Sequence, residues 1–226
     1  MSNVFTKLRR RLQFGPPIII VTGLPRSGTS MVMRMLQAGG VAVTTDGERR
    51  ADEDNPLGYF EVERVKRLQQ EQDKSWLTQS RGKAIKVISH LLQSLPHDNY
   101  YKVILCERDL GEVLSSQNVM LKRREQVNPI DDSEARAHYE RHLAHIRIFM
   151  KVKRNMEFLP VRYDEAISNP ACSRNVSISF SADGSTCSAW SRSSTASCIA
   201  IARSPHDTRS SRSRSSCSQS RSALDY

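Results

Sequence analysis

The sequence of 226 residues lacks any run of about 18 apolar residues, the length that a membrane-spanning helix needs. Its first 14 residues are basic, but they contain no apolar core of about 7–15 residues, as a secretory signal requires. These absences exclude an integral membrane protein and favour the cytoplasm as the location. No membrane partner is expected.

Cysteine pairs with the spacing of a metal site are also absent. Four of the five cysteines lie after residue 171, and no two cysteines are separated by the two residues typical of zinc ligands. Cys106 lies in an apolar segment, which predicts a small core residue. Three histidines share one helix face, but no carboxylate accompanies them as in metalloprotease motifs, so we expect a solvated face at His138, His142 and His145. No metal is predicted.

Lysine and glutamate are missing from the last 56 residues, 171–226, which contain 19 serines. A segment of this composition buries too little apolar surface to offset the entropy of ordering, so it is expected to be disordered. Two explanations stay open. The stretch RSSRSRS (209–215) is similar to a phosphorylatable arginine–serine tail. The other is a slip of the coding frame near residue 171, which would replace a helix containing Lys and Glu with an unrelated sequence rich in Ser and Arg.

Composition and patterning divide the chain into a basic lead-in (1–14), an α/β domain (15–170) and the Ser/Arg-rich tail (171–226). The chain has 34 Lys and Arg against 24 Asp and Glu, a net charge of +10. A basic domain suits an anionic ligand and would also suit a nucleic acid. The lead-in is expected to present a solvated basic helix face rather than an arm for nucleic acid, which is therefore not the expected partner.

The most informative stretch is residues 16–39. Ile18-Ile19-Ile20-Val21 is an uninterrupted apolar run, which predicts a strand buried on both faces. Residues 30–36 predict a helix that ends at two glycines. The loop between them is GLPRSGTS (23–30). A strand, a glycine-containing loop and a helix start present backbone N–H groups to an anion, so the loop predicts a site for a phosphate or a sulfate ester.

This loop differs from the Walker loop of nucleoside triphosphatases. Its two glycines have the Walker separation, but Thr29 stands where that loop needs a lysine, and the cation is Arg26. A nucleoside triphosphatase or a P-loop kinase is therefore disfavoured, whereas anion binding is not. The alternative, a tight strand–helix turn without a ligand, is weaker here because a buried strand precedes the loop and a helix follows it.

Further apolar segments predict strands at 41–43, 83–88, 101–106 and 158–162, and helical periodicity predicts helices at 61–73, 110–124 and 133–154. Asp109 is placed to cap a helix, and Pro160 predicts an edge strand or a bulge. Alternating strands and helices predict a three-layer α/β fold with a central parallel sheet. Ligands of such sheets bind beyond the carboxyl ends of the strands, a rim expected to gather the loop at Gly23, His90, Arg108 and Tyr163.

Residues 16–170 resemble the sulfotransferases that use 3′-phosphoadenosine 5′-phosphosulfate (PAPS), and are most similar to the compact bacterial members with a P-loop fold. Four segments carry the resemblance. GLPRSGTS (23–30) is similar to the family's 5′-phosphosulfate loop, and CERDLGEVLSSQ (106–117) to its 3′-phosphate element. NPLGYFE (55–61) looks like a segment common in the bacterial branch. VRYDEAISNP (161–170) resembles the strand end and helix start that precede the family's C-terminal region.

The resemblance implies transfer of a sulfuryl group from PAPS to a hydroxyl or amine of a small molecule or glycan. It implies a 5′-phosphosulfate site at Gly23, Arg26, Ser27, Gly28, Thr29 and Ser30, and a 3′-phosphate site at Arg108 and Ser116. The charges of the donor agree with this arrangement. PAPS has three anionic groups, so it needs cations and N–H donors at two places.

Transfer would be an in-line displacement at sulfur that needs positioning and charge stabilisation but no metal. Arg26 is the candidate to stabilise the leaving oxygen. Lys86 either assists or is a surface lysine. The acceptor hydroxyl needs a base, and two candidates stay open. His90 ends the segment KVISH (86–90), which is two residues longer than the family's Lys-Thr-His segment, and Glu61 is a candidate because some branches use a glutamate. A solvated or capping role is open for both.

One family element has no counterpart. Members use a C-terminal segment, often with Arg-Lys-Gly, to close over the adenine and the 3′-phosphate, and no such segment follows residue 171. The sequence therefore predicts weak donor binding or an inactive chain. The alternative function is a non-catalytic P-loop binding protein whose arginine–serine tail recruits nucleic acid or acidic partners. The acceptor and the oligomeric state are left open.

Overall fold

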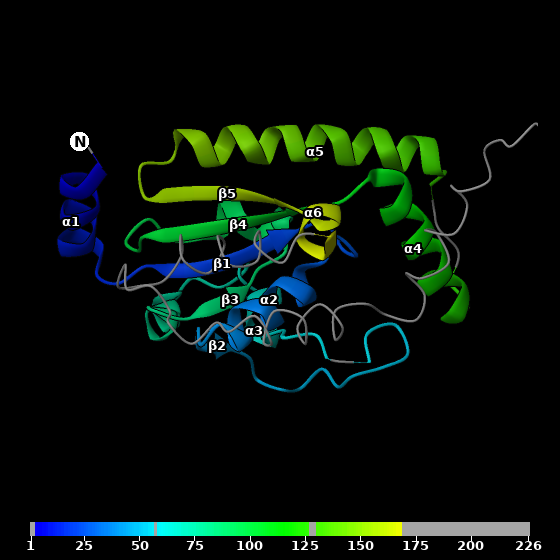
Figure 1. Ribbon diagram of the computed structural model, residues 1–226, viewed down its shortest axis with the longest axis horizontal. Helices are drawn as coiled ribbons and strands as arrows, with labels where there is room; N and C mark the ends of the chain where they lie inside the picture. The colour runs from blue at the N-terminus through cyan, green and yellow to red at the C-terminus, as the bar shows by residue number, and fades with distance from the viewer. Residues whose placement is uncertain (1–2, 57, 127–129, 169–226) are drawn as a thin grey trace, which may run out of the picture.

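The structure is a computed structural model that describes residues 3–56, 58–126 and 130–168. The Ser/Arg-rich tail predicted for 171–226 lies outside the described residues. Five strands form one all-parallel sheet in the order β2-β3-β1-β4-β5 (Figure 1). They are β1 (Ile18–Gly23), β2 (Val43–Thr44), β3 (Ala84–Lys86), β4 (Tyr101–Glu107) and β5 (Met156–Arg162). The predicted α/β fold with a central parallel sheet is confirmed.

Helices cover both faces of the sheet. They are α1 (Asn3–Phe14), α2 (Thr29–Ala38), α3 (Glu63–Lys66), α4 (Leu110–Arg123), α5 (Asp132–Val152) and α6 (Tyr163–Ser168), with 3₁₀ helices η1 (Ser75–Ser80) and η2 (Ser89–Ser94). Residues of α3, α5, η1 and η2 share one hydrophobic core with the sheet, and residues of α2 and α6 share the other. The long helix α5 runs parallel to the strands across the top of the sheet, and α1 stands at one end (Figure 1).

The central strand β1 is buried on both faces, as its four apolar residues predict. Ile18 and Ile20 lie in the core beneath α5, whereas Ile19 and Val21 lie in the core beneath α2. All four are fully buried. Each such side chain contributes about 1.5–3 kcal/mol when it leaves water, so this strand is a large source of stability for its length.

The register of the sheet gathers the ends of its strands at one rim. Gly23 at the end of β1 is paired with Cys106 on β4, and Cys106 is paired with Val161 on β5. Because all strands are parallel, the loop after β1, Arg108 after β4 and Tyr163 after β5 emerge together. The shared rim that the sequence predicts for these three segments is present.

Several element boundaries follow local signals in the sequence. The Asp109 side chain accepts a hydrogen bond from the backbone N–H of Glu112 at 3.1 Å, so it caps α4 as predicted. Pro160 lies in β5, which is an edge strand because, among the described residues, only β4 pairs with it. Cys106 is buried and forms no disulfide, as predicted for a core residue.

The predicted helix at 61–73 is wrong in extent. The helical hydrogen bonds of α3 end at Lys66, and turns follow to residue 70. The Glu71 carboxylate then accepts hydrogen bonds from Arg64 Nε at 2.9 Å and from Trp76 Nε1 at 2.8 Å. These contacts join the segment after α3 to Trp76 of η1, which a periodicity count does not reveal. Val65 and Leu68 from the predicted apolar stripe are nevertheless buried.

We predict that Gly23→Ala destabilises the fold by more than about 2 kcal/mol, because it forces β1 away from β4. A Cβ atom on Gly23 would lie 2.7 Å from the backbone oxygen of Cys106 and closer still to Ser27 Oγ. Gly47→Ala is the control, since Gly47 has a φ of +72° and no atom within 4 Å of a Cβ. That control should lose only about 1 kcal/mol. Urea unfolding of both variants measures the difference, and equal losses would contradict the packing argument.

Candidate functional site

Two glycines fix the shape of the loop after β1. Gly28 precedes α2 with a φ of +96°, and a Cβ atom there would lie 2.7 Å from the ring of Tyr163. Gly23 lies against Ser27 and the backbone of Cys106, as described above. Both positions therefore require a residue without a side chain, Gly28 also because of its left-handed backbone. This need accounts for the two glycines of the GLPRSGTS segment.

The loop also holds polar groups that nothing in the described structure satisfies. Ser27 is 2% exposed, and its hydroxyl has no hydrogen-bond partner among the described residues. No side chain caps the first turn of α2. A buried hydroxyl without a partner costs about 1–3 kcal/mol, and the first N–H groups of a helix attract anions. Both features suit a bound anion at the loop.

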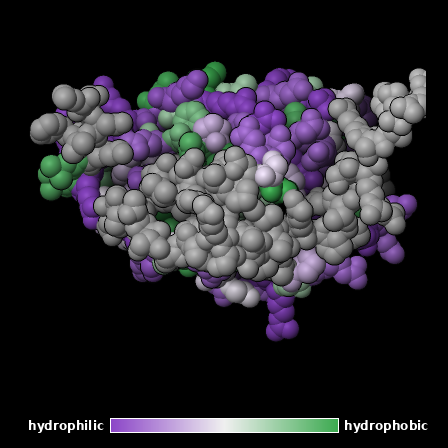
Figure 2. All heavy atoms as spheres, viewed as in Figure 1, coloured by the Kyte–Doolittle hydropathy of each residue, from purple (hydrophilic) through white to green (hydrophobic). Residues whose placement is uncertain are grey.

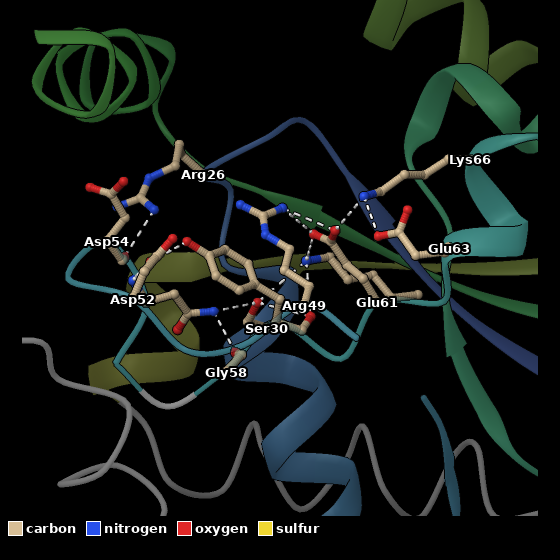
Figure 3. A network of polar contacts seen from close by, with 12 residues as sticks. Arg26, Ser30, Arg49, Asp52, Asp54, Gly58, Glu61, Glu63 and Lys66 are labelled. Carbon is tan, nitrogen blue, oxygen red and sulfur yellow. Dashed lines mark hydrogen bonds and ion pairs between the residues drawn. The ribbon is translucent and has the colours of Figure 1, made fainter. Parts of the chain in front are cut away.

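Arg26 adopts a strained conformation in the middle of the loop. Its φ is +69°, a left-handed value that costs a residue with a side chain about 1–3 kcal/mol. This conformation directs the side chain toward α4, where Arg26 Nε donates to Ser116 Oγ at 2.9 Å. A second N–H, on Nη1, donates to the backbone oxygen of Asp54 at 3.1 Å (Figure 3). These bonds use two of the five N–H donors that an arginine has.

Arg108 lies beside the same loop. Its Nη1 donates to the backbone oxygen of Arg26 at 3.4 Å, and its Nε pairs with Glu112 at 2.8 Å. The guanidinium lies 4.1 Å from the ring centre of Tyr163. Arg108 also lines a cleft of about 490 Å³ between the ends of β4 and β5 and the helices α4 and α5. Arg26, Arg108 and Ser116, which the sequence assigns to two anion sites, are therefore joined by direct contacts.

A second polar cluster lies on the other side of the loop. Lys86 at the end of β3 donates to the backbone oxygen of Tyr59 at 3.2 Å and lies 3.4 Å from both Ser30 Oγ and Glu61 Oε1. Its side chain is 12% exposed, so it is not a surface lysine. Glu61 receives two hydrogen bonds from Arg49, at 2.8 and 2.9 Å (Figure 3). The structure thus brings Lys86 and Glu61 to Ser30 at the start of α2.

The charges of this cluster are coupled. Burial is the largest influence on Glu61 and would raise its pKa, but the Arg49 hydrogen bonds and the charges of Lys86, Arg49 and Lys66 hold that pKa below its ordinary value. Burial lowers the pKa of Lys86, while the neighbouring Glu61 opposes this effect. A carboxylate held by cations is a weaker base than a free one, which limits Glu61 as a proton acceptor.

Residues of the segments 49–56 and 58–61 contact the loop and the start of α2. Asn55 Nδ2 donates to Ser30 Oγ at 3.2 Å, and Arg34 of α2 donates to Asn55 Oδ1 at 2.9 Å. The Arg49 guanidinium lies 3.5 Å from the ring centre of Tyr59, which is buried. Sequence reasoning missed Arg34 and Arg49. Arg34 and Arg49 contact residues 10 or more positions away in the sequence. The one signal that could have indicated Arg34 is its position one turn after Ser30 in the predicted helix.

His90 lies apart from these clusters. Its ring stacks on His142 of α5, with the ring centres 3.9 Å apart, and His142 also bonds Ser89 Oγ at 2.8 Å. The solvated face predicted for three histidines is therefore wrong at His142, whose pKa burial and the neighbouring histidines lower to about 4. Within the described residues, no hydrogen bond or ion pair joins His90 to Lys86 or Glu61.

Searches against family models, curated proteins and solved structures find no match to this chain. In the described part of the chain, no helix is long and apolar enough to cross a bilayer. The same part has no group of three or more His, Cys, Asp or Glu side chains positioned to hold a metal ion. Any account of function therefore rests on the site geometry.

We predict that Glu61→Gln lowers the free energy of unfolding at pH 7 by about 1–3 kcal/mol, because it leaves Lys86 without its counter-charge in a half-buried site. Since the pKa of Glu61 is lowered in the folded state, its contribution is complete above its ordinary pKa near 4.5 and is lost as the pH falls through the folded value. The difference between wild type and variant should therefore shrink below about pH 4.5.

Glu63→Gln is the matched control, because Glu63 is 38% exposed and pairs only with Lys66 among the described residues. Such an exposed pair contributes less than about 1 kcal/mol. Chemical unfolding between pH 3 and pH 7 measures both variants. A Glu61 variant no less stable than the Glu63 variant would show that the cluster does not stabilise the fold.

Proposed function

We propose that the protein is a sulfotransferase that transfers a sulfuryl group from PAPS to a hydroxyl or amine of a small molecule or glycan. In this proposal the loop at 23–30 is a P-loop-type site for the 5′-phosphosulfate. Arg108 and Ser116 bind the 3′-phosphate. The observation that carries the proposal is the hydrogen bond between Arg26 and Ser116, together with the contact of Arg108 with the Arg26 backbone.

These contacts support the proposal because one nucleotide must reach both anion sites. Arg26 belongs to the loop after β1, whereas Ser116 lies 90 residues later on α4. A donor with anionic groups at its 5′ and 3′ positions needs two cationic sites separated by little more than a ribose. ATP has no 3′-phosphate, so it would gain no phosphate contact from Arg108 and Ser116. The cleft beside Arg108 provides space next to the second site.

The remaining chemistry follows from the same geometry. The acceptor oxygen or nitrogen attacks sulfur, the bond from sulfur to the bridging oxygen breaks, and adenosine 3′,5′-bisphosphate leaves with the electron pair. Arg26 within the loop and Lys86 beside Ser30 are suited to stabilise the charge on that oxygen. Glu61 lies against Lys86, whereas His90 stacks on α5. Of the two candidates, Glu61 therefore lies nearer the loop, although Lys86 and Arg49 reduce its basicity as a proton acceptor.

We predict that adenosine 3′,5′-bisphosphate stabilises the protein and that ATP does so much less. At about 100 times the dissociation constant, the bisphosphate should raise the melting temperature by about 5–10 °C. Thermal unfolding with each nucleotide measures the effect. Equal stabilisation by both would contradict a 3′-phosphate site, and no effect from either would favour the non-catalytic alternative.

We further predict that Arg26→Ala and Arg108→Ala each weaken bisphosphate binding about 10- to 100-fold, because each removes charge-assisted hydrogen bonds to phosphate. Arg67→Ala is the control, since Arg67 is exposed and lies at the end of α3. Titration calorimetry measures affinity, and transfer of labelled sulfate from PAPS measures activity. Binding that survives both substitutions would remove these arginines from the donor site.

A further inference from the structure

Helix α1 combines basic and apolar residues and contains no acidic residue. Lys7, Arg9, Arg10 and Arg11 give its 12 residues four positive charges. Leu8 is 55% exposed and Leu12 is 80% exposed. Single exposed leucines are common, but two that are four residues apart form an apolar stripe on one side of the helix. Their exposure needs an explanation.

The two leucines point away from the body of the protein. Residues four apart lie on the same side of an α-helix, whereas residues two apart lie on nearly opposite sides. Leu8 and Leu12 are four apart, and Arg10 is two residues from each. The Arg10 guanidinium pairs with Glu157 of β5 and lies 5.4 Å from the ring centre of Tyr100. Arg10 therefore holds α1 on the body, and the leucine side faces outward.

The end of α5 provides a second exposed apolar pair at the same end of the molecule. Ile148 is 64% exposed and Val152 is 70% exposed, and the exposed basic residues Lys151 and Arg154 accompany them. β5 begins at Met156, directly after this end of α5, so Glu157 anchors α1 close to it. Figure 1 shows α1 beside the end of the sheet where α5 passes into β5. Figure 2 shows hydrophobic side chains over α1 and again along the top over α5.

We propose that this end of the protein, formed by α1 and the end of α5, docks on the surface of an anionic phospholipid membrane. The leucines would insert among the lipid headgroups, and the flanking Arg9 and Arg11 would bind lipid phosphates and carboxylates. Charge complementarity favours lipid over other occupants. A second copy of this chain would bring one positive helix against another, and a nucleic acid would not use the exposed leucines.

This proposal departs from the sequence-based expectation of no membrane partner, which was drawn from the lack of a membrane-spanning segment. A helix that lies in the interface needs only an apolar stripe flanked by basic residues, and not the length that spans a bilayer. The docking end holds the amino ends of the strands, whereas the loop at 23–30 lies at their carboxyl ends. The candidate site would therefore face away from the lipid and stay open to water, so docking and site do not compete for the same surface.

Vesicle sedimentation with the full chain tests this inference. We expect binding to vesicles with about 30% phosphatidylserine in phosphatidylcholine, and little binding to phosphatidylcholine alone. The double variant Leu8→Ser, Leu12→Ser should lower the partition coefficient at least about tenfold. Arg9→Gln, Arg11→Gln, which keeps the leucines, should lower it by a similar factor and weaken its dependence on salt. Val119→Ser on α4 is the control, because Val119 is 49% exposed and outside the docking end.

All three variants change exposed side chains, and the melting temperatures of the leucine variant and of Val119→Ser should match that of the wild type. The arginine variant is compared at a temperature at which its own thermal unfolding shows it to be folded. Equal binding of wild type and the leucine variant would overturn the inference, as would equal binding to neutral and anionic vesicles. Sedimentation velocity supplies a further outcome. A dimer that the leucine substitutions dissociate, without binding to vesicles, would assign this face to a second copy. Binding to duplex DNA that needs only the arginines, again without vesicle binding, would assign it to nucleic acid.

Discussion

The burial of β1 on both faces is the constraint on which the structure depends. This strand lies between β3 and β4, and its alternate residues enter two different cores. A parallel strand in this position must leave the sheet through a sharp turn, because a helix has to return across one face. Gly23 and Gly28 permit that turn at a place where side chains would overlap neighbouring atoms. The candidate site therefore lies at this turn because β1 is central in the sheet and α2 must pack back on it.

Around this turn, cations are held by partners of different kinds. Arg26 bonds a hydroxyl and a backbone carbonyl, neither of which neutralises its charge. Lys86 instead lies against the carboxylate of Glu61, which also pairs with Arg49. A cation bonded only to neutral groups in a partly buried site keeps its attraction for an anion. The Arg26 guanidinium can therefore attract an anionic ligand, whereas the charge of the Lys86 ammonium is largely balanced by Glu61.

Sequence reasoning succeeded where the signal is local. The isoleucines of β1, the cap at Asp109 and the edge strand at Pro160 depend on residues close in the chain, and each was found. It failed where contacts between side chains decide the outcome. The helix expected over 61–73 stops early because Trp76 and Arg64 both bond Glu71. The solvated face expected at His142 is covered because η2, some 50 residues earlier, lies against it.

The sequence by itself determined the parallel sheet, the glycine loop and the rim where polar residues gather, because apolar periodicity and turn chemistry are read over a few neighbouring residues. Only the tertiary structure decided which polar residues meet. It brings Arg26 to Ser116 and Lys86 to Glu61. It stacks His90 of η2 on His142 of α5, and it leaves the leucines of α1 facing outward. The physical reason is that hydrogen bonds and ion pairs act over a few ångströms between residues far apart in the chain, and no local pattern encodes such partners.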